Sequence, residues 1–371
     1  MNAVRFFRVV NFKESKYEIA KHSSLNRCRS HYDFRSVNFF GSGGAGGTCA
    51  SDITSDGQIN GPDLAQLLAD WGPCPGPCAS DIIGDGEING ADLAQLLADW
   101  GQCPAVVPAW ATLLEAAPNP AVVTDANLRA AIVASGFAWR IKDTSSNIEM
   151  LLVPEGTFTR GCSPGDAECG GDEIPHEVTL TNAFYMGKTE VTQAQWQAKM
   201  MSNPSYFVAA NGFPENFDRP VDSVTWSTIA SGSNSFMSLT GLRLPTEAEW
   251  EYACRAATTP ALYGVLDDIA WYQSNSVSQT HAVAGKLPNA LGLYDTLGNV
   301  SEWCQDWYGS YSSGSVTNPT GPTTGTCRLL RGAGWGDYSN AFSASKRNFE
   351  VPDYNPDVSY WSIGFRAVRT P

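Results

Sequence analysis

Two helix-like apolar patterns near the start of the chain are almost identical in letters. "CASDITSDGQINGPDLAQLLADWGPC" spans 49–74 and "CASDIIGDGEINGADLAQLLADWGQC" spans 78–103, which gives an internal repeat with a period of 29 residues. Leucines recur at i, i+3 and i+4 in the shared segment "DLAQLLADW". This spacing predicts one short amphipathic helix in each repeat, so residues 49–104 are expected to form a small helical module of two similar units.

The pattern changes in the C-terminal part of the chain, over 139–371. "MLLVPEGTFTRG" and "HEVTLTNAFYMGK" alternate apolar and polar positions as strands do, and a helix is predicted to open at Thr192. "LRLPTEAEWEYACRAA" contains a capping box from Thr246 to Glu249 and is predicted to be a helix. Short strands, few helices and long loops rich in Gly and Pro predict a domain of the α+β class.

Two other segments flank the repeats. Residues 105–138 contain the helical patterns "AWATLLEAA" and "TDANLRAAIVASG", the second with Thr124 or Asp125 as N-cap and Gly136 as its end. They are predicted to form a helical connector. Residues 1–48 are a basic leader that ends in the flexible linker "GSGGAGG", and their composition predicts disorder.

Charge is unevenly distributed along the chain. The formal net charge of -14 argues against a nucleic acid partner. Residues 49–104 contain nine Asp or Glu and no Lys or Arg. Because crowded carboxylates repel one another unless a cation neutralises them, this acidic block indicates calcium.

The letters of each repeat before its helix fit a calcium loop. Such a loop needs oxygen ligands at alternating positions and a Gly at the sixth position for the sharp turn. Ile83 occupies the third position of the second loop and offers no side-chain oxygen, so the second site is predicted to be the weaker. The predicted ligands are Asp52, Thr54, Asp56, the Gln58 carbonyl, Asn60 and Asp63 in the first loop, and Asp81, Asp85, the Glu87 carbonyl, Asn89 and Asp92 in the second.

The paired motif, an EF-hand-like loop running into a helix, resembles the dockerin type I repeat. That resemblance implies a calcium-stabilised extracellular module that docks onto a cohesin. The alternative is a spacer that calcium folds and that has no cohesin partner. Cysteines bracket each copy, Cys49 with Cys74 and Cys78 with Cys103, which suggests one disulfide per repeat.

Ten cysteines and only four histidines lack the spacing of a zinc site, so disulfides are the expected use of the thiols. Disulfides place the protein in a secreted or other extracytoplasmic compartment. The first residues conflict with this expectation, because their apolar patch is interrupted by Arg8 and is too short for a signal peptide. The sequence contains no run of about 20 apolar residues that would span a membrane.

Five stretches of the C-terminal part occur in a familiar order: "VPEGTFTRG", "KTEVTQAQW", "RLPTEAEWEYACR", "PNALGLYDTLGNVSEW" and "RGAGW…IGFRAVR". Together they resemble the sulfatase-modifying factor family, whose founding members are formylglycine-generating enzymes. The resemblance implies an α+β domain related to the C-type lectin fold. It also implies a calcium site at Asp295, the carbonyls of Gly298 and Val300, and Glu302.

Catalytic members of that family use a copper-bound cysteine pair and molecular oxygen to convert a sulfatase cysteine into formylglycine. Alignment of "RGAGW" with the family motif puts Asp337 and Phe342 at the two cysteine positions. Copper(I) needs soft thiolates, so copper is not expected here. Cys254 matches a structural cysteine whose usual partner position is Arg347, and Cys162 with Cys169 is predicted to close a surface loop.

Three functional hypotheses follow from these residues. The first is a non-catalytic recognition domain on a calcium-stabilised stem, with a ligand-binding surface at Trp335, Asp337, Tyr338 and Asn340, since such side chains combine rigid area with adaptable hydrogen bonds. The second is a formylglycine-generating oxidoreductase, which the missing cysteines disfavour. The third is another enzyme on the same scaffold.

Overall fold

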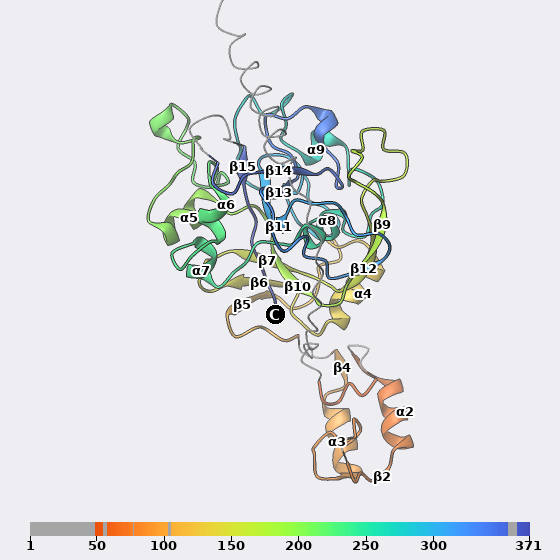
Figure 1. Cartoon of the computed structure of the whole chain (residues 1–371). Helices are drawn as coiled ribbons and strands as arrows, with labels where there is room; N and C mark the ends of the chain where they lie inside the picture. Colours follow the sequence, from red (N-terminus) through yellow and green to blue (C-terminus); the bar gives the residue numbers. More distant parts are fainter. Residues whose placement is uncertain (1–48, 55–57, 77, 103–104, 355–361) are drawn as a thin grey trace, which may run out of the picture.

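The computed structural model describes residues 49–54, 58–76, 78–102, 105–354 and 362–371. The predicted leader at 1–48 and the predicted ligand Asp56 lie outside these residues. Figure 1 shows two parts, a small module made by the repeats and a larger domain of mixed helix and sheet. The mixed architecture confirms the predicted α+β character of the larger domain.

Each repeat contributes one helix, as predicted: α2 (Gly61–Ala69) and α3 (Gly90–Ala98). Both helices begin with a capping box, Asn60 with Asp63 and Asn89 with Asp92, because a side-chain oxygen there satisfies amides that have no partner inside the helix. Four short strands surround the helices: β1 (Gln58–Ile59), β2 (Gly72–Pro73), β3 (Glu87–Ile88) and β4 (Gly101–Gln102).

The strands of the module pair between repeats and not within them. β1 of the first loop pairs with β4, which follows the second helix, and β2 after the first helix pairs with β3 of the second loop. Ile59, Leu67, Ile88 and Leu96 form the core between the two halves. Neither repeat therefore encloses a core alone.

This exchange of strands corrects the predicted disulfide pairing. Cys74 bonds to Cys78, so the bridge joins the end of the first repeat to the start of the second. Cys49 is also in a disulfide. The predicted bonds of Cys49 with Cys74 and of Cys78 with Cys103 are both wrong, because β2 carries Cys74 to the partner repeat, where it bonds to Cys78.

A five-stranded antiparallel sheet with the order β16-β10-β7-β6-β5 forms one side of the larger domain. The segment "AWATLLEAA" supplies its edge strand, so the helix predicted there is wrong. Ala111 pairs with Asp143 across the ladder, and this tertiary pairing overrides the helical pattern. The strands are β5 (Ala111–Glu115), β6 (Arg140–Asp143), β7 (Glu149–Val153), β10 (Phe184–Gly187) and β16 (Val368–Arg369).

Two further sheets complete the larger domain. One has the order β12-β9-β8 and contains β8 (Gly156–Arg160), β9 (His176–Leu180) and β12 (Val316–Thr317). The other has the order β14-β13-β11-β15 and contains β11 (Ser301–Trp307), β13 (Arg328–Arg331), β14 (Asn348–Glu350) and β15 (Ile363–Gly364).

Short helices cover these sheets, and α8 lies centrally against β8, β11 and β13 (Figure 1). Of the two predicted N-caps Thr124 and Asp125, the structure has Asp125, and the predicted helix start at Thr192 and capping box at Thr246 are confirmed. Each of these three side chains accepts a hydrogen bond from a backbone amide of its helix. The helices are α4 (Ala126–Ala134), α5 (Gln193–Met200), α6 (Trp226–Ala230), α7 (Phe236–Thr240), α8 (Glu247–Arg255) and α9 (Leu266–Ile269), with 3-10 turns η1 (Ala209–Asn211) and η2 (Ser339–Ala341).

The described residues include no helix with the length and apolar character needed to cross a bilayer. Disulfides join Cys74 to Cys78 and Cys162 to Cys169, the latter as predicted. Such bonds are typical of proteins that fold outside the reducing cytosol.

Candidate functional site

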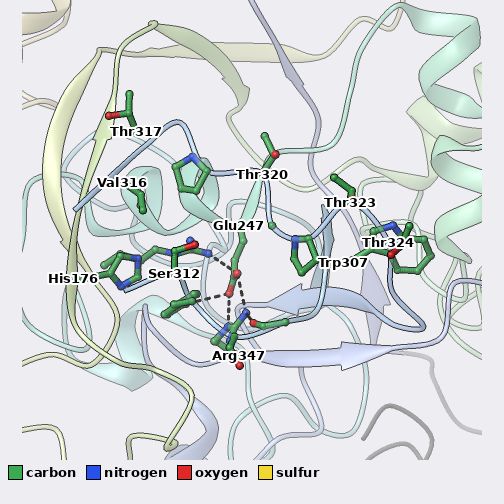
Figure 2. A pocket seen from close by; sticks show the side chains of 17 residues that line it. His176, Glu247, Trp307, Ser312, Val316, Thr317, Thr320, Thr323, Thr324 and Arg347 are labelled. Carbon is green, nitrogen blue, oxygen red and sulfur yellow. Dashed lines mark hydrogen bonds and ion pairs between the residues drawn. The ribbon is translucent and has the colours of Figure 1, made fainter. Parts of the chain in front are cut away.

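A cleft of about 1310 Å³ opens between the β12-β9-β8 sheet and the loop that follows β11. Arg160 and His176, which face each other across the β8–β9 ladder, line one wall. Residues 309–312 and 319–324 line the opposite wall, and the first residue of α8, Glu247, lies at the floor (Figure 2). Sequence reasoning missed this cleft, since the loop carries no periodic pattern.

Glu247 is buried and is held by three guanidinium groups. Arg347 donates to both of its oxygens at 2.7 and 3.1 Å, Arg331 donates at 3.2 Å, and Arg160 forms a third ion pair. Burial alone would raise the pKa of this carboxyl, but the three guanidiniums outweigh it and lower the pKa to about 2. Glu247 is therefore a fixed anion in the floor of the cleft.

The four predicted binding residues lie on the segment Leu329–Phe342, whose Arg331 reaches Glu247 but which does not itself line the cleft. Arg331 ends β13, and Gly332 follows with φ +89, where a Cβ would approach the Thr296 carbonyl oxygen at 2.7 Å. Only glycine fits this left-handed, close-packed position. The chain then turns into η2 and carries the predicted binding residues past the end of the sheet.

The four predicted binding residues are not equivalent. Tyr338 is 51% exposed and Asn340 is also exposed, whereas Trp335 is partly buried and packs edge-to-face on Phe207 at 5.4 Å. Asp337 is buried, and its carboxylate accepts a hydrogen bond from the Gly334 amide at 2.8 Å. The structure thus leaves Tyr338, Asn340 and part of Trp335 accessible and gives Asp337 an internal role.

Phe342 is also buried, in an apolar cluster that includes Trp250, Leu297 and Leu329. Its ring packs against Tyr272 at 5.8 Å between centroids. The segment thus ends in a packed side chain that fixes it to the domain. Both Asp337 and Phe342 stabilise the turn and neither faces solvent.

A model of the sulfatase-modifying factor enzyme 1-like domain matches residues 139–371, which is more than half of the chain. The chain belongs to this family. The formylglycine-generating enzyme of Streptomyces coelicolor is 32% identical over 328 residues, with 68% of this chain and 96% of the enzyme covered. The serine/threonine-protein kinase pkn1 of Chlamydia pneumoniae is 29% identical, and the match covers 60% of this chain and only 38% of that protein's length.

Solved structures agree with the family assignment. Treponema denticola variable protein 1 is 31% identical with a TM-score of 0.52, and the match covers 60% of this chain and 95% of that one. PvdO from Pseudomonas aeruginosa is 23% identical with a TM-score of 0.53, covering 62% of this chain and 98% of that one, and so shares the fold.

The family's copper chemistry requires two thiolates, and the cysteines described here do not fit it. Cys254 and Cys304 are free but buried. Burial raises the pKa of the Cys254 thiol to about 11 and that of the Cys304 thiol well above its usual value, so both stay protonated. Cys327 is in a disulfide. These cysteines therefore do not fit a copper(I) site.

In the larger domain, the implied calcium ligand Glu302 is hydrogen bonded by two side chains. Both oxygens of Glu302 accept hydrogen bonds from Arg366 at 2.7 Å, and Trp250 donates to one of them at 2.7 Å. The Asp295 carboxylate accepts from the Ala284 amide, and burial raises its pKa to about 6. Glu302 is engaged by a guanidinium, whereas one oxygen of the Asp295 carboxylate is buried without a hydrogen-bond partner among the described residues. The calcium site at Asp295, Gly298, Val300 and Glu302 therefore stays a prediction.

The second repeat loop does present a cluster of oxygens. Carboxylate oxygens of Asp81, Asp85 and Asp92 lie within 4.8 Å of one another. Asp81 also accepts hydrogen bonds from the amides of Gly84 and Gly86, which shapes the loop around it. A hard cation with six to eight oxygen ligands suits such a group, so these residues fit calcium.

The first loop has the same framework. The buried Asp63 carboxylate accepts from both the amide and the hydroxyl of Thr54 at 2.9 Å, and from the Asn60 amide. Asp92 accepts the equivalent bond from the Asn89 amide in the second loop. The predicted ligands Asp52, Gln58 and Glu87 lie in the described parts of the same two loops.

Asp306, near the end of β11, is another buried carboxyl with a shifted pKa. One oxygen accepts a hydrogen bond from the Glu247 amide at 2.9 Å. Burial, reinforced by the negative Glu247, raises the Asp306 pKa to about 7. Because this value exceeds the usual 3.8, the stability that the protonated form contributes is full below about pH 4 and is lost as pH rises through 7.

Asp306→Asn should therefore change how stability depends on pH. The side-chain amide of Asn cannot ionise, but its oxygen can still accept a hydrogen bond from the Glu247 backbone amide. Wild type loses stability as Asp306 ionises, so the free energy of unfolding of the variant should rise relative to that of wild type by about 2–4 kcal/mol between pH 4 and pH 8. Urea unfolding at several pH values measures this difference. The exposed Asp268→Asn is the matched control, and parallel curves for wild type and Asp306→Asn would contradict the assignment.

Proposed function

We propose that this chain is a non-catalytic member of the family, with a C-terminal domain that recognises a ligand or protein and a repeat module that folds around calcium. The observation that carries the proposal is the use made of the two positions where catalytic relatives have cysteines. Asp337 caps a turn through the Gly334 amide, and Phe342 fills an apolar cluster. Both side chains are buried, and neither can donate a thiolate.

Recognition is assigned to the surface beside these two positions. Tyr338 and Asn340 are exposed, and Trp335 is anchored by Phe207, so the segment offers aromatic and amide groups on a rigid support. A tyrosine supplies much contact area for little loss of conformational entropy. The disulfides support an extracytoplasmic setting for such binding.

The repeat module is proposed to bind calcium and to resemble a dockerin in form. Its helices expose matching apolar side chains, Leu68 and Trp71 in the first repeat and Leu97 and Trp100 in the second, each about half exposed. Such side chains suit docking to a cohesin-like partner. The alternative is a spacer between the leader and the larger domain.

A second candidate function is a formylglycine-generating oxidoreductase that acts on sulfatase cysteines. Its support is the 32% identity to the Streptomyces coelicolor enzyme over 96% of that enzyme's length. The residues at positions 337 and 342 oppose it.

Incubation with copper(I), oxygen and a sulfatase-derived cysteine peptide should give no aldehyde product. Product formation should lie below the detection limit, because the copper chemistry depends on soft ligands that Asp337 and Phe342 do not provide. Mass spectrometry of the peptide is the measurement. The Streptomyces coelicolor enzyme, run in parallel, is the positive control, and a formyl product above the copper-only blank would favour the second candidate.

Screening of the full chain against arrays of glycans and of secreted proteins should yield a ligand that depends on Tyr338. Truncation of a central aromatic contact costs about 2 kcal/mol or more, so Tyr338→Ala should weaken binding by roughly 30-fold in a titration. Leu239→Ala, which removes an exposed apolar side chain on α7, should leave it unchanged. Equal affinities of the two variants would exclude this surface as the binding site.

Calcium should raise the melting temperature of the repeat module and Asp81→Asn should reduce the rise. A ligand that binds only the folded state, present at 100 times its dissociation constant, stabilises that state by about 2.7 kcal/mol.

Calorimetric titration with calcium should show two binding affinities, and the loop that contains Ile83 should be the weaker site. Magnesium, which prefers octahedral sites with several waters, is the control ion. An unchanged melting temperature on addition of calcium would remove the calcium assignment.

A further inference from the structure

The cleft above Glu247 is lined by none of the predicted binding residues Trp335, Asp337, Tyr338 and Asn340 and by no residue of the repeat loops. The family resemblance assigns it nothing. Its volume of about 1310 Å³ exceeds that of an ordinary small-molecule pocket. What it binds can be inferred from the charges at its floor and the groups on its walls, independently of the function proposed above.

The three guanidiniums around Glu247 differ in how fully they are neutralised. Arg331 also pairs with Glu251 at 2.5 Å, and Arg347 also pairs with Asp172 at 3.3 Å. Arg160 has Glu247 as its ion-pair partner, and its buried Nε makes no hydrogen bond within the described part of the chain. Arg331 and Arg347 thus each pair with two carboxylates, whereas Arg160 pairs with Glu247 alone among the described residues and shares it with the other two arginines.

Neighbouring acids do not remove this excess of positive charge. Asp306 lies close enough to interact with Arg160, but its pKa of about 7 leaves it partly neutral near neutral pH. Glu251 is shared between Arg255 and Arg331. Because Arg160 is almost fully buried, its charge is poorly screened by water and attracts an anion that enters the cleft.

Hydroxyl groups line the same cleft as Arg160. Ser312, Thr317, Thr320, Thr323 and Thr324 line the cleft, and Figure 2 shows them arranged around Glu247 and Arg347. None of the five hydroxyls hydrogen bonds to another described residue. They are available as donors and acceptors for a ligand that carries hydroxyl groups of its own.

The aromatic rings of the cleft are already covered. The Tyr311 ring lies 4.2 Å from both Arg160 and Arg347, and the Trp307 ring lies 3.5 Å from Arg328. These rings therefore hold the arginines in place, and the guanidiniums occupy the ring faces on which they lie. A flat apolar ligand would find little surface, so a polar ligand is favoured.

The wall loop is fixed before any ligand arrives. Arg347 donates to the Gly309 carbonyl at 2.9 Å, and β12 pairs with β9. Gly325 lies so close to Trp307 that a Cβ would approach the side chain at 2.8 Å. Binding would therefore cost little ordering of this loop, which favours affinity for a small ligand.

We propose that this cleft binds a small polyhydroxylated ligand with an oxyanion, such as a uronic acid or a sulfated sugar, through Arg160 and the threonine and serine hydroxyls. A planar guanidinium matches a carboxylate or sulfate through parallel hydrogen bonds. The hydroxyls then fix the remainder of the ligand. Both sources share one chemistry, an oxyanion on a sugar.

Calorimetric titration of the full chain with D-glucuronate, D-glucose 6-sulfate and D-glucose tests the proposal. At least one anionic sugar should bind 10-fold or more tightly than glucose. The double variant Thr320→Val, Thr323→Val should weaken that binding about 5-fold to 10-fold, and Arg160→Lys should weaken it about 10-fold while it retains the charge that Glu247 requires. Arg243→Lys, in an ion pair with Glu249 outside the cleft, is the matched control.

The threonine variants carry the test if Arg160→Lys fails to fold, because Thr320 and Thr323 lie on an exposed loop. Equal binding of glucose and the anionic sugars would overturn the proposal. Absence of saturable binding by both anionic sugars would overturn it as well. Anion binding that neither the threonine variants nor a folded Arg160→Lys weakens would place the site elsewhere and also overturn it.

Discussion

The larger domain depends on an ionic network buried at the start of α8. Glu247 and Glu251 lie in the interior, where an unpaired carboxylate would cost several kcal/mol of desolvation. Arg331 satisfies both, and Arg255 pairs with Glu251 at 2.8 Å and donates to the Gly161 carbonyl at 2.7 Å. One network therefore joins α8 to β13 and to the loop after β8, so these elements must pack together or leave charges exposed to an apolar interior.

The same constraint positions both candidate sites. Arg331 fixes the end of β13, and the turn at Gly332 then places the exposed Tyr338 at a defined distance from the core. Through Glu247, the first residue of α8, Arg160 and Arg347 extend the network to the cleft. The recognition surface and the cleft thus differ in chemistry but share their support.

The sequence predicts these features unevenly, for physical reasons. The capping box at Thr246 is local, since a cap and its amide lie three residues apart, and it is confirmed, as is the predicted helix start at Thr192. The edge strand at 111–115 depends on pairing with β6, so its helical pattern misleads. The Cys74–Cys78 bond likewise follows from strand exchange between repeats. The cleft joins distant residues, and no window of sequence contains it.

The letters that carry the family resemblance can be explained by the fold alone. In "RGAGW", Arg331 neutralises two buried glutamates, Gly332 adopts a positive φ against the Thr296 carbonyl, and Gly334 lies where a Cβ would approach Ser362 at 2.8 Å. Each of these requirements exists whether or not the domain oxidises a substrate. The chemistry of catalytic relatives depends instead on positions 337 and 342, where this chain has a turn cap and a core phenyl ring. A match to the motif therefore indicates a shared fold and not a shared activity. The function depends on the side chains that the fold leaves exposed.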